Sequence, residues 1–263
     1  MGANCCVCSG GTACHQTFES CTGNEAPRMN KIGSGFRYHI LCYGDSLTCG
    51  FYNGGTAFEP YGHALQESLC AMGLDCTVSS VGLSGLTAAE LAARSTSPAV
   101  IDTVGKCGKG LAKILEECSW WDLVVIMAGT NDIGKCFQAA SIMHSVEQLH
   151  RVCHNSNVRT FALAAPYPTG WQTRREHFNS LLASWAKAQP RCASYVDPED
   201  IIPRQEKELW EKDRLHFSPK GSIRLGHGLA PFIRSALLRE IDEEDTNDDG
   251  EVESVVDSID PVD

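Results

Sequence analysis

Residues Tyr38–Thr48 read YHILCYGDSLT, and this stretch decides both the fold and the chemistry expected of the chain. Its apolar beginning, Tyr38–Cys42, predicts a buried strand that stops at Gly44, Asp45 and Ser46. Parallel sheets place their chemistry at the carboxyl ends of strands, so Ser46 is expected at the rim of a sheet, where a nucleophile belongs. Taken alone, Gly-Asp-Ser is better explained as strand-to-helix turn chemistry, with a helix N-cap at Asp45 or Ser46. The rest of the chain has to decide between these interpretations.

Apolar runs alternate with helical patterns along the rest of the chain. The run at Leu123–Ala128 is continuous and β-branched, which is typical of a central parallel strand covered on both faces. After the first strand we expect strands at Cys76–Val81, Leu123–Ala128, Val158–Ala164 and Ala193–Val196. We expect helices at Pro60–Met72, Thr87–Arg94, Leu111–Cys118, Ala139–Cys153, Thr173–Ala188 and Gly221–Glu240, and irregular structure over residues 95–107. This alternation predicts a doubly wound, three-layer α/β/α domain with a five-stranded parallel sheet and right-handed crossovers.

Four polar turns follow this framework in order. Gly-Asp-Ser at 44–46, Gly-x-x-Gly at 82–85 and Gly-x-Asn-Asp at 129–132 each end a predicted strand, and Asp213 and His216 stand just before the last helix. Asp and His three residues apart in a loop can turn to one side, although the pair by itself is better explained as a surface salt bridge with an incidental histidine. Together the four turns make the chain, from about Tyr38 to Leu238, resemble the SGNH, or GDSL, hydrolase family.

The resemblance implies a flavodoxin-like SGNH hydrolase fold and a role for each matching residue. Ser46 would be the nucleophile, His216 its general base, and Asp213 the group that fixes the imidazole tautomer. The backbone N–H groups of Ser46 and Gly82 and the side-chain amide of Asn131 would form the oxyanion hole. No cofactor or metal is implied.

The resemblance leaves the substrate open, because the family spans arylesterases, lysophospholipases, thioesterases and carbohydrate O-acetyl esterases. Two loops with aromatic residues are expected to bind it, through Phe51, Tyr52, Tyr167 and Trp171. We expect a serine esterase that hydrolyses small or medium acyl esters through an acyl-enzyme. A lysophospholipase or thioesterase and a carbohydrate O-acetyl esterase are alternatives within the family. An alternative of another class is a membrane-tethered, calcium-responsive binding scaffold, which would have no need of both Ser46 and His216.

Length and charge limit the possible domain organisation of the chain. With 263 residues, 43% of them hydrophobic, it can bury one substantial core, so we expect one domain over residues 36–240, a disordered Cys- and Gly-rich arm over 1–35 and an acidic tail over 241–263. The net charge of −11 belongs to the C-terminus, since the twelve Asp and Glu from Glu240 onward leave 21 acidic residues against 22 Lys and Arg. No basic stripe appears, so the expected partner is a small-molecule ester and not a nucleic acid. The oligomeric state stays open.

The N-terminal arm carries the only hint of a membrane. No apolar run approaches a membrane span and no secretory signal is present, so the protein is expected in the cytoplasm. The opening MGANCCVC resembles a myristoylation signal at Gly2 with palmitoylation sites at Cys5, Cys6 and Cys8, although Cys6 stands where Ser or Thr is usual. Acylation would hold the protein at a membrane, and the alternative is an unmodified arm. Most of the 14 Cys are expected to be reduced and buried.

The acidic tail imitates a calcium-binding loop. Residues 245–253 follow the EF-hand pattern through its ninth position, but Val256 stands where a bidentate Glu is needed. A solvated acidic tail is the better interpretation.

Overall fold

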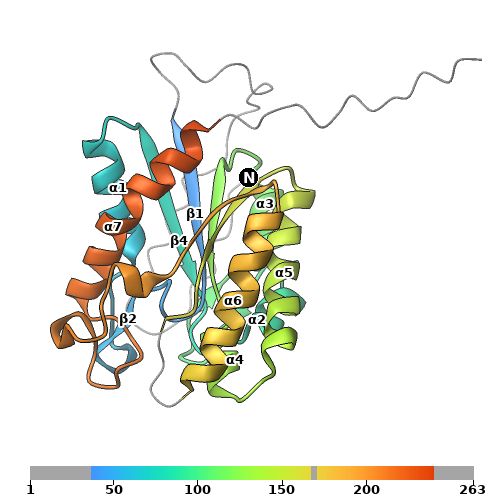
Figure 1. Cartoon of the computed structure of the whole chain (residues 1–263). Helices are drawn as coiled ribbons and strands as arrows, with labels where there is room; N and C mark the ends of the chain where they lie inside the picture. The colour runs from blue at the N-terminus through green and yellow to red at the C-terminus, as the bar shows by residue number, and fades with distance from the viewer. Residues whose placement is uncertain (1–36, 167–170, 240–263) are drawn as a thin grey trace, which may run out of the picture.

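A five-stranded parallel sheet forms the middle layer of the structure, which is a computed structural model (Figure 1). The structure describes residues 37–166 and 171–239. The strands run in the order β4 (Cys76–Gly82), β1 (Tyr38–Gly44), β7 (Leu123–Met127), β8 (Arg159–Leu163) and β9 (Cys192–Val196). All four neighbouring pairs are parallel. The predicted α/β fold with a five-stranded parallel sheet is confirmed.

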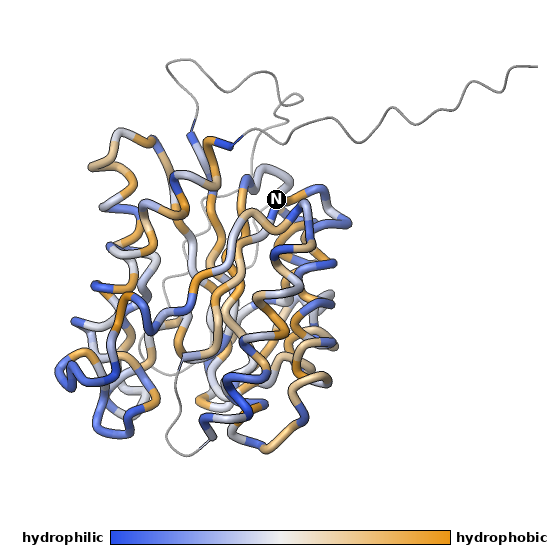
Figure 2. Tube along the Cα trace, viewed as in Figure 1, coloured by the Kyte–Doolittle hydropathy of each residue, from blue (hydrophilic) through white to orange (hydrophobic). Residues whose placement is uncertain are grey.

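Helices cover both faces of this sheet, as Figure 1 shows. On one face lie α1 (Tyr61–Ala71) and α7 (Pro219–Leu238). On the other lie α2 (Ala88–Ala93), α3 (Leu111–Glu117), α5 (Ala139–Asn155) and α6 (Gln172–Ala188). The tube in Figure 2 is hydrophobic along the central strands and hydrophilic along the outer sides of many helices, which is the pattern of a three-layer domain.

Alternation along β1 divides the core into two clusters. Leu41 and Tyr43 belong to the cluster under α2, α3, α5 and α6, whereas Ile40 and Cys42 belong to the cluster under α1 and α7. Successive side chains of a strand point to opposite faces, so one apolar run supplies both cores. This is why the sequence of β1 is continuously apolar instead of alternating.

The strand order brings the sequence motifs to one edge of the sheet. β1 lies between β4 and β7, with Gly44 opposite Gly82 on one side and Met127 on the other. The order reverses at β1, because the next strand along the chain pairs on one side of it and the later strands pair on the other. Such a switch point is where open α/β sheets bind ligands. The segments that follow β1, β4 and β7 therefore meet there.

Several short elements differ from the expectation. The Gly-x-Asn-Asp turn is the start of a short helix, α4 (Thr130–Gly134), which Gly129 introduces in the left-handed conformation with φ of 110°. Glycine tolerates this φ because it has no Cβ. The remaining short elements are β2 (Phe51–Tyr52), β3 (Ala57–Phe58), β5 (Val100–Ile101), β6 (Cys107–Gly108) and the 3-10 turns η1 (Asn53–Gly55), η2 (Pro198–Asp200) and η3 (Lys207–Leu209). Residues 95–107, expected to be irregular, thus contribute to a two-stranded ribbon of β5 and β6.

Some expectations fall outside the described residues. These are the acylation sites Gly2, Cys5, Cys6 and Cys8, the acidic tail, and Tyr167. None of the helices in the described ranges is both long enough and apolar enough to span a bilayer.

The cysteines of the described part are mostly reduced, as expected. Eight of them carry no disulfide, but fewer are buried than expected: Cys42, Cys76, Cys153 and Cys192 are buried, Cys49 and Cys107 are partly buried, and Cys70 and Cys136 are exposed. Cys118 is disulfide-bonded, which corrects the expectation for that residue.

Candidate active site

Ser46, His216 and Asp213 form one hydrogen-bonded chain. The Ser46 Oγ lies 2.9 Å from the His216 Nε2, and the His216 Nδ1 lies 2.7 Å from the Asp213 Oδ2. A carboxylate can only accept, so it holds the proton on Nδ1 and leaves the lone pair of Nε2 for the serine hydroxyl. Ser46 is buried and the His216 side chain is 12% exposed, so the pair is shielded but reachable. This is the relationship of a nucleophile to its base.

The loop that carries Asp213 and His216 is held by its own backbone. Trp210 pairs with Phe217 in an antiparallel bridge, and the Glu211 N–H donates to the His216 carbonyl at 2.8 Å. The other carboxylate oxygen of Asp213 accepts from the backbone N–H of His216 at 3.0 Å. The partial burial of Asp213 raises its pKa, but the hydrogen bonds from the His216 side chain and nearby backbone N–H groups outweigh burial and leave the pKa lowered. Asp213 is therefore an anion at neutral pH.

Helix α7 begins directly after this loop and fixes its end. The Ser218 side chain caps the helix by accepting from the Gly221 N–H at 3.2 Å, and Pro219 occupies the first turn. The same hydroxyl donates to the Glu208 carbonyl at 2.6 Å. The N-terminus of α7 and the segment before the loop are thus joined close to His216.

Phe51 packs on the imidazole of His216. Their ring centroids are 4.4 Å apart, and Phe58 meets Phe51 edge to face at 6.0 Å. Phe51 is predicted to bind substrate, and the structure places its ring on the His216 imidazole. A hydrophobic ring in this place limits the rotation of the imidazole.

The predicted oxyanion donors come from three adjacent strands. Ser46 follows β1, Gly82 ends β4 and Asn131 follows β7. The Leu83 N–H donates to Gly44 in β1 at 2.9 Å, so the N–H of the preceding residue, Gly82, points away from β1 at this edge strand. The Asn131 Nδ2 donates one hydrogen to the Leu86 carbonyl at 2.9 Å, which fixes the amide and leaves its second hydrogen available.

Only glycine fits at position 82. A Cβ there would lie 2.2 Å from the Cys49 backbone nitrogen and 2.6 Å from the Asp45 carbonyl oxygen. Both are backbone atoms of the segment that carries Ser46, so a larger residue would push that segment away from β4. Gly82 therefore sets how closely the Ser46 segment approaches the edge strand.

Two buried aspartate side chains, Asp45 and Asp132, hold the turns around the site. The Asp45 Oδ1 accepts from the Leu47 N–H at 3.0 Å, and the Asp132 Oδ2 accepts from the Ala88 N–H at 2.8 Å. Burial raises the pKa of Asp45 to about 7, opposed by the hydrogen bond from Leu47 and strengthened by the nearby charge of Asp132. Burial also raises the pKa of Asp132. Both hold turns, at the start of the Ser46 segment and at α2.

The other predicted substrate residues lie further out. Tyr52 follows Phe51 in β2, where successive side chains point to opposite faces, so it turns away from the imidazole. Trp171 is 38% exposed at the start of α6, with its ring near Gly134 at the end of α4. Cys49 contacts the Ser84 hydroxyl at 3.3 Å, and burial raises its thiol pKa to about 12, so it is not a competing nucleophile at neutral pH.

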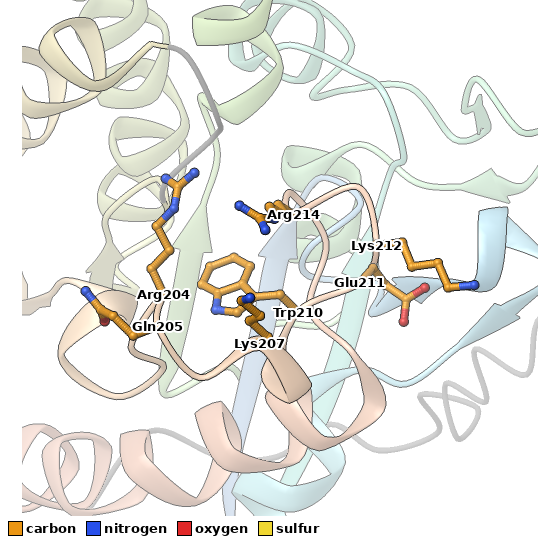
Figure 3. A pocket seen from close by; sticks show the side chains of 7 residues that line it. All are labelled: Arg204, Gln205, Lys207, Trp210, Glu211, Lys212 and Arg214. Carbon is orange, nitrogen blue, oxygen red and sulfur yellow. The ribbon is translucent and has the colours of Figure 1, made fainter.

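A pocket of about 520 Å³ lies along the loop of Asp213 and His216 (Figure 3), and no sequence motif indicates it. Trp210 lies among its lining side chains, and most of the others are cationic. The cations come from separate turns of residues 204–214, so they form no continuous basic run in the sequence.

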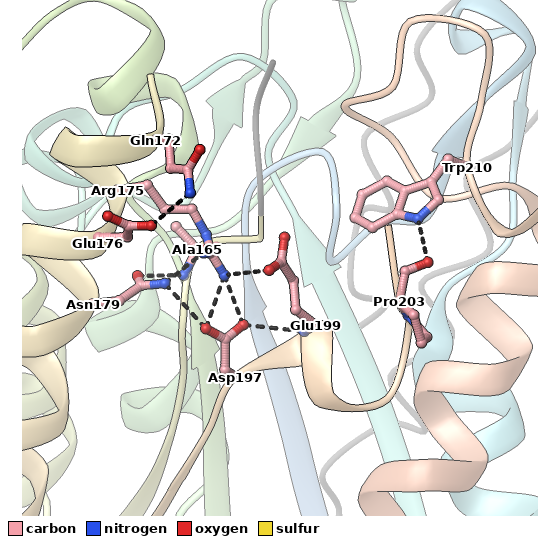
Figure 4. A network of polar contacts seen from close by, with 9 residues as sticks. All are labelled: Ala165, Gln172, Arg175, Glu176, Asn179, Asp197, Glu199, Pro203 and Trp210. Atoms are coloured by element: carbon pink, nitrogen blue, oxygen red, sulfur yellow. Dashed lines mark hydrogen bonds and ion pairs between the residues drawn. The ribbon is translucent and has the colours of Figure 1, made fainter. Parts of the chain in front are cut away.

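An ion-pair network beside the end of β9 anchors the segment that leads to this loop (Figure 4). The Arg175 Nη2 donates to both carboxylate oxygens of Asp197, at 2.9 and 2.8 Å, and lies 3.5 Å from Glu199. The Arg175 Nε donates to the Ala165 carbonyl at 2.8 Å, and Asn179 donates to the same oxygen at 3.0 Å. The network therefore joins α6 to the ends of β8 and β9.

Solved structures of esterases share this fold. A carbohydrate acetylesterase family member from Sinorhizobium meliloti matches with a TM-score of 0.59 and 20% identity, over 76% of this chain and 99% of its own. The psychrotrophic esterase EstA from Pseudoalteromonas sp. matches with a TM-score of 0.60 and 19% identity, over 76% and 99%. The family 3 carbohydrate esterase of Clostridium thermocellum matches with a TM-score of 0.58 and 20% identity, over 77% and 98%. At these identities the likeness establishes the fold.

The sequence itself matches a family model. No curated protein sequence matches the chain. The model of the GDSL-like Lipase/Acylhydrolase family matches residues 42–222, which include the Ser46 turn and the Asp213–His216 loop. The chain therefore belongs to the GDSL-like lipase/acylhydrolase family and is a hydrolase that acts on ester bonds.

Proposed function

We propose that this chain is a serine esterase that hydrolyses small or medium acyl esters through an acyl-enzyme at Ser46. The observation that carries the proposal is the 2.9 Å contact between the Ser46 Oγ and the His216 Nε2, with Asp213 bonded to the other ring nitrogen at 2.7 Å. A neutral hydroxyl is a weak nucleophile, and this arrangement gives it a base.

The proposed reaction has two similar halves, acylation of Ser46 and hydrolysis of the acyl-enzyme. The Ser46 Oγ attacks the ester carbonyl carbon as its proton passes to the His216 Nε2, and the carbonyl oxygen becomes negative. The N–H groups of Ser46, Gly82 and Asn131 stabilise that charge. The intermediate collapses, the alcohol leaves with the proton from His216, and the acyl group stays on Ser46. Water then repeats the attack, which releases the acid and restores the serine.

Two observations favour short acyl groups. The Phe51 ring packs on one side of His216 and Phe58 packs against Phe51, and a Cβ on Gly55 would lie 2.5 Å from the Phe51 ring. Two of the similar folds are carbohydrate esterases, one of them named an acetylesterase. Acetyl and butanoyl esters are therefore the first substrates to test, with octanoyl esters as the comparison.

The experiment compares the wild type with Ser46→Ala on 4-nitrophenyl acetate, butanoate and octanoate. We expect turnover to fall by about 10⁴-fold or more in the variant, with the acetate and butanoate hydrolysed faster than the octanoate by the wild type. A fluorophosphonate reagent should add covalently to the peptide that contains Ser46. Ser84→Ala is the matched control, because it removes a buried hydroxyl outside the chain of Ser46 and His216. Wild-type turnover in Ser46→Ala would overturn the proposal.

A further inference from the structure

The pocket beside the Asp213–His216 loop is strongly cationic (Figure 3). Four of its lining side chains, Arg204, Lys207, Lys212 and Arg214, are positive, against one acid, Glu211. The Glu211 carboxylate accepts a hydrogen bond from the Asn53 backbone N–H at 3.1 Å, and this partner is not one of the four cations. The lining therefore carries an excess of positive charge.

Three of these cations form no ion pair in the described part of the chain. Lys207, Lys212 and Arg214 are exposed, and over residues 37–166 and 171–239 no ion pair forms with any of the three. The described lysines and arginines elsewhere often pair with acids, as Arg224 does with Glu206 at 2.6 Å. A group of unpaired cations around one cavity repels itself, and an anion bound there would relieve the repulsion.

The pocket has a rigid aromatic wall. The Trp210 Nε1 donates to the Pro203 carbonyl at 3.3 Å, and the side chain is buried. In Figure 3 the guanidinium groups of Arg204 and Arg214 lie on the same side of the Trp210 indole, and the Lys207 side chain overlaps the indole in this view. Lys212 extends away from the two guanidinium groups. Arg204, Lys207 and Arg214 line the pocket together with Trp210.

The same loop connects this pocket to the reaction centre. Arg214 directly follows Asp213 and stands two residues before His216. Its φ of 57° lies in the left-handed region, which non-glycine residues adopt rarely. Arg214 therefore belongs to the same short loop as Asp213 and His216.

We propose that this pocket binds an anionic group on the alcohol portion of the ester, so that the enzyme prefers esters of phosphorylated or carboxylated alcohols. The proposal rests on the proposed esterase function and adds a specificity site to it. Two planar guanidinium groups match the paired oxygens of a phosphate or carboxylate, and the lysine adds a third charge. A volume of about 520 Å³ accommodates such a group together with a three-carbon alcohol.

The test uses three esters that differ only in the charge of the alcohol: the monobutanoyl esters of glycerol, glycerate and glycerol 3-phosphate. We expect kcat/KM to be about tenfold higher for at least one anionic ester than for the glycerol ester at low salt, and the ratio to fall as salt rises. A preference for the phosphate over the glycerate ester identifies a dianion site, and equal preference identifies a general carboxylate or phosphate site. Equal kcat/KM for all three would overturn the proposal.

Two substitutions locate the effect. Arg214→Asn removes the charge and keeps a residue that tolerates positive φ, while Lys207→Gln removes a charge from the opposite part of the pocket. Each should lower the ratio of anionic to neutral kcat/KM by about threefold to fivefold, and Arg214→Lys should restore part of it. Lys187→Gln, an exposed lysine at the end of α6, makes the same change in net charge and should leave the ratio as in the wild type. An equal fall in the ratio for Lys187→Gln would overturn the site.

A binding measurement separates the two proposals. Ser46→Ala protein should bind butanoyl glycerol 3-phosphate more tightly than butanoyl glycerol in calorimetry, and Lys207→Gln in that background should weaken the binding of the phosphate ester. If the wild type hydrolyses the neutral ester but the variant binds both esters equally, the esterase proposal stands and the anion site is refuted. Preference in binding without hydrolysis refutes the esterase and supports the site.

Discussion

The ring of Phe51 lies against the imidazole of His216, with 4.4 Å between centroids and 33° between planes. Asp213 holds one edge of that imidazole and Ser46 meets the other, so the phenyl ring controls the remaining freedom, rotation of the ring plane. Phe51 reaches this position because the hairpin of β2 and β3 folds back immediately after the Ser46 turn. It acts as a positioning residue for the base.

Replacing Phe51 by leucine tests this role. Phe51→Leu should lower kcat by about tenfold to a hundredfold, because a small displacement of the base disrupts proton transfer, and should change KM less. Steady-state kinetics with 4-nitrophenyl butanoate measure both. Phe58→Leu is the matched control, since Phe58 contacts Phe51 but not His216. If Phe51→Leu raised only KM, Phe51 would be a substrate contact instead.

Asn131 should act on the transition state. Asn131→Ala removes a donor that the carbonyl oxygen needs once it becomes negative, so kcat should fall by about 10²–10³ with little change in KM. Thermal unfolding of the variant measures the cost of losing the bond to the Leu86 carbonyl. A kcat within threefold of the wild type would remove Asn131 from the oxyanion hole.

Asp45 should give the fold a distinct pH dependence. Burial raises its pKa in the folded protein to about 7, against 3.8 for an ordinary aspartate. The folded state therefore binds this proton more tightly, and the stability it contributes is complete below about pH 4 and is lost as the pH rises to 7. Relative to the wild type, Asp45→Asn should gain free energy of unfolding over this range, by at most about 1.4 kcal/mol per pH unit. Urea unfolding from pH 4.5 to 8.5 measures the difference, and a difference independent of pH would contradict the buried proton.

The pair of Arg175 and Asp197 should matter more than surface pairs do. The Arg175 side chain is 6% exposed, so Arg175→Gln leaves a poorly solvated carboxylate and should lower the free energy of unfolding by about 3 kcal/mol. Arg151→Gln breaks an exposed pair with Glu147 and should cost less than about 1 kcal/mol. Urea unfolding at pH 7 measures both variants. Equal losses would show that burial adds nothing to the pair.

The regular part of the fold follows from local sequence. Leu123–Met127 is buried at every position, and its β-branched run predicts a central strand because no polar residue interrupts either face. The helix expected from Thr87 to Arg94 forms as α2, and Thr87 caps it in a capping box with Glu90. Strands of two residues, such as β2 and β5, are too short to show a hydrophobic period. They depend on long-range packing, so local sequence does not predict them.

The candidate site likewise contains residues that sequence motifs predict and residues that they do not. Ser46, Gly82, Asn131, Asp213 and His216 stand in short motifs at predicted strand ends or before a helix, and the parallel sheet collects the first three at one edge. The position of Phe51 on His216 is not visible in any motif, because it depends on how a hairpin folds back. The sequence does not predict the cationic pocket either, because Arg204, Lys207 and Arg214 line one pocket only when their loop folds around Trp210.

Ser46 and its base are separated by 170 positions in the chain. A ribosome must therefore deliver nearly the whole domain before the hydroxyl meets the imidazole. Translation products that end before His216 should therefore lack hydrolase activity. Recovery of turnover during refolding should accordingly lag behind the formation of helices.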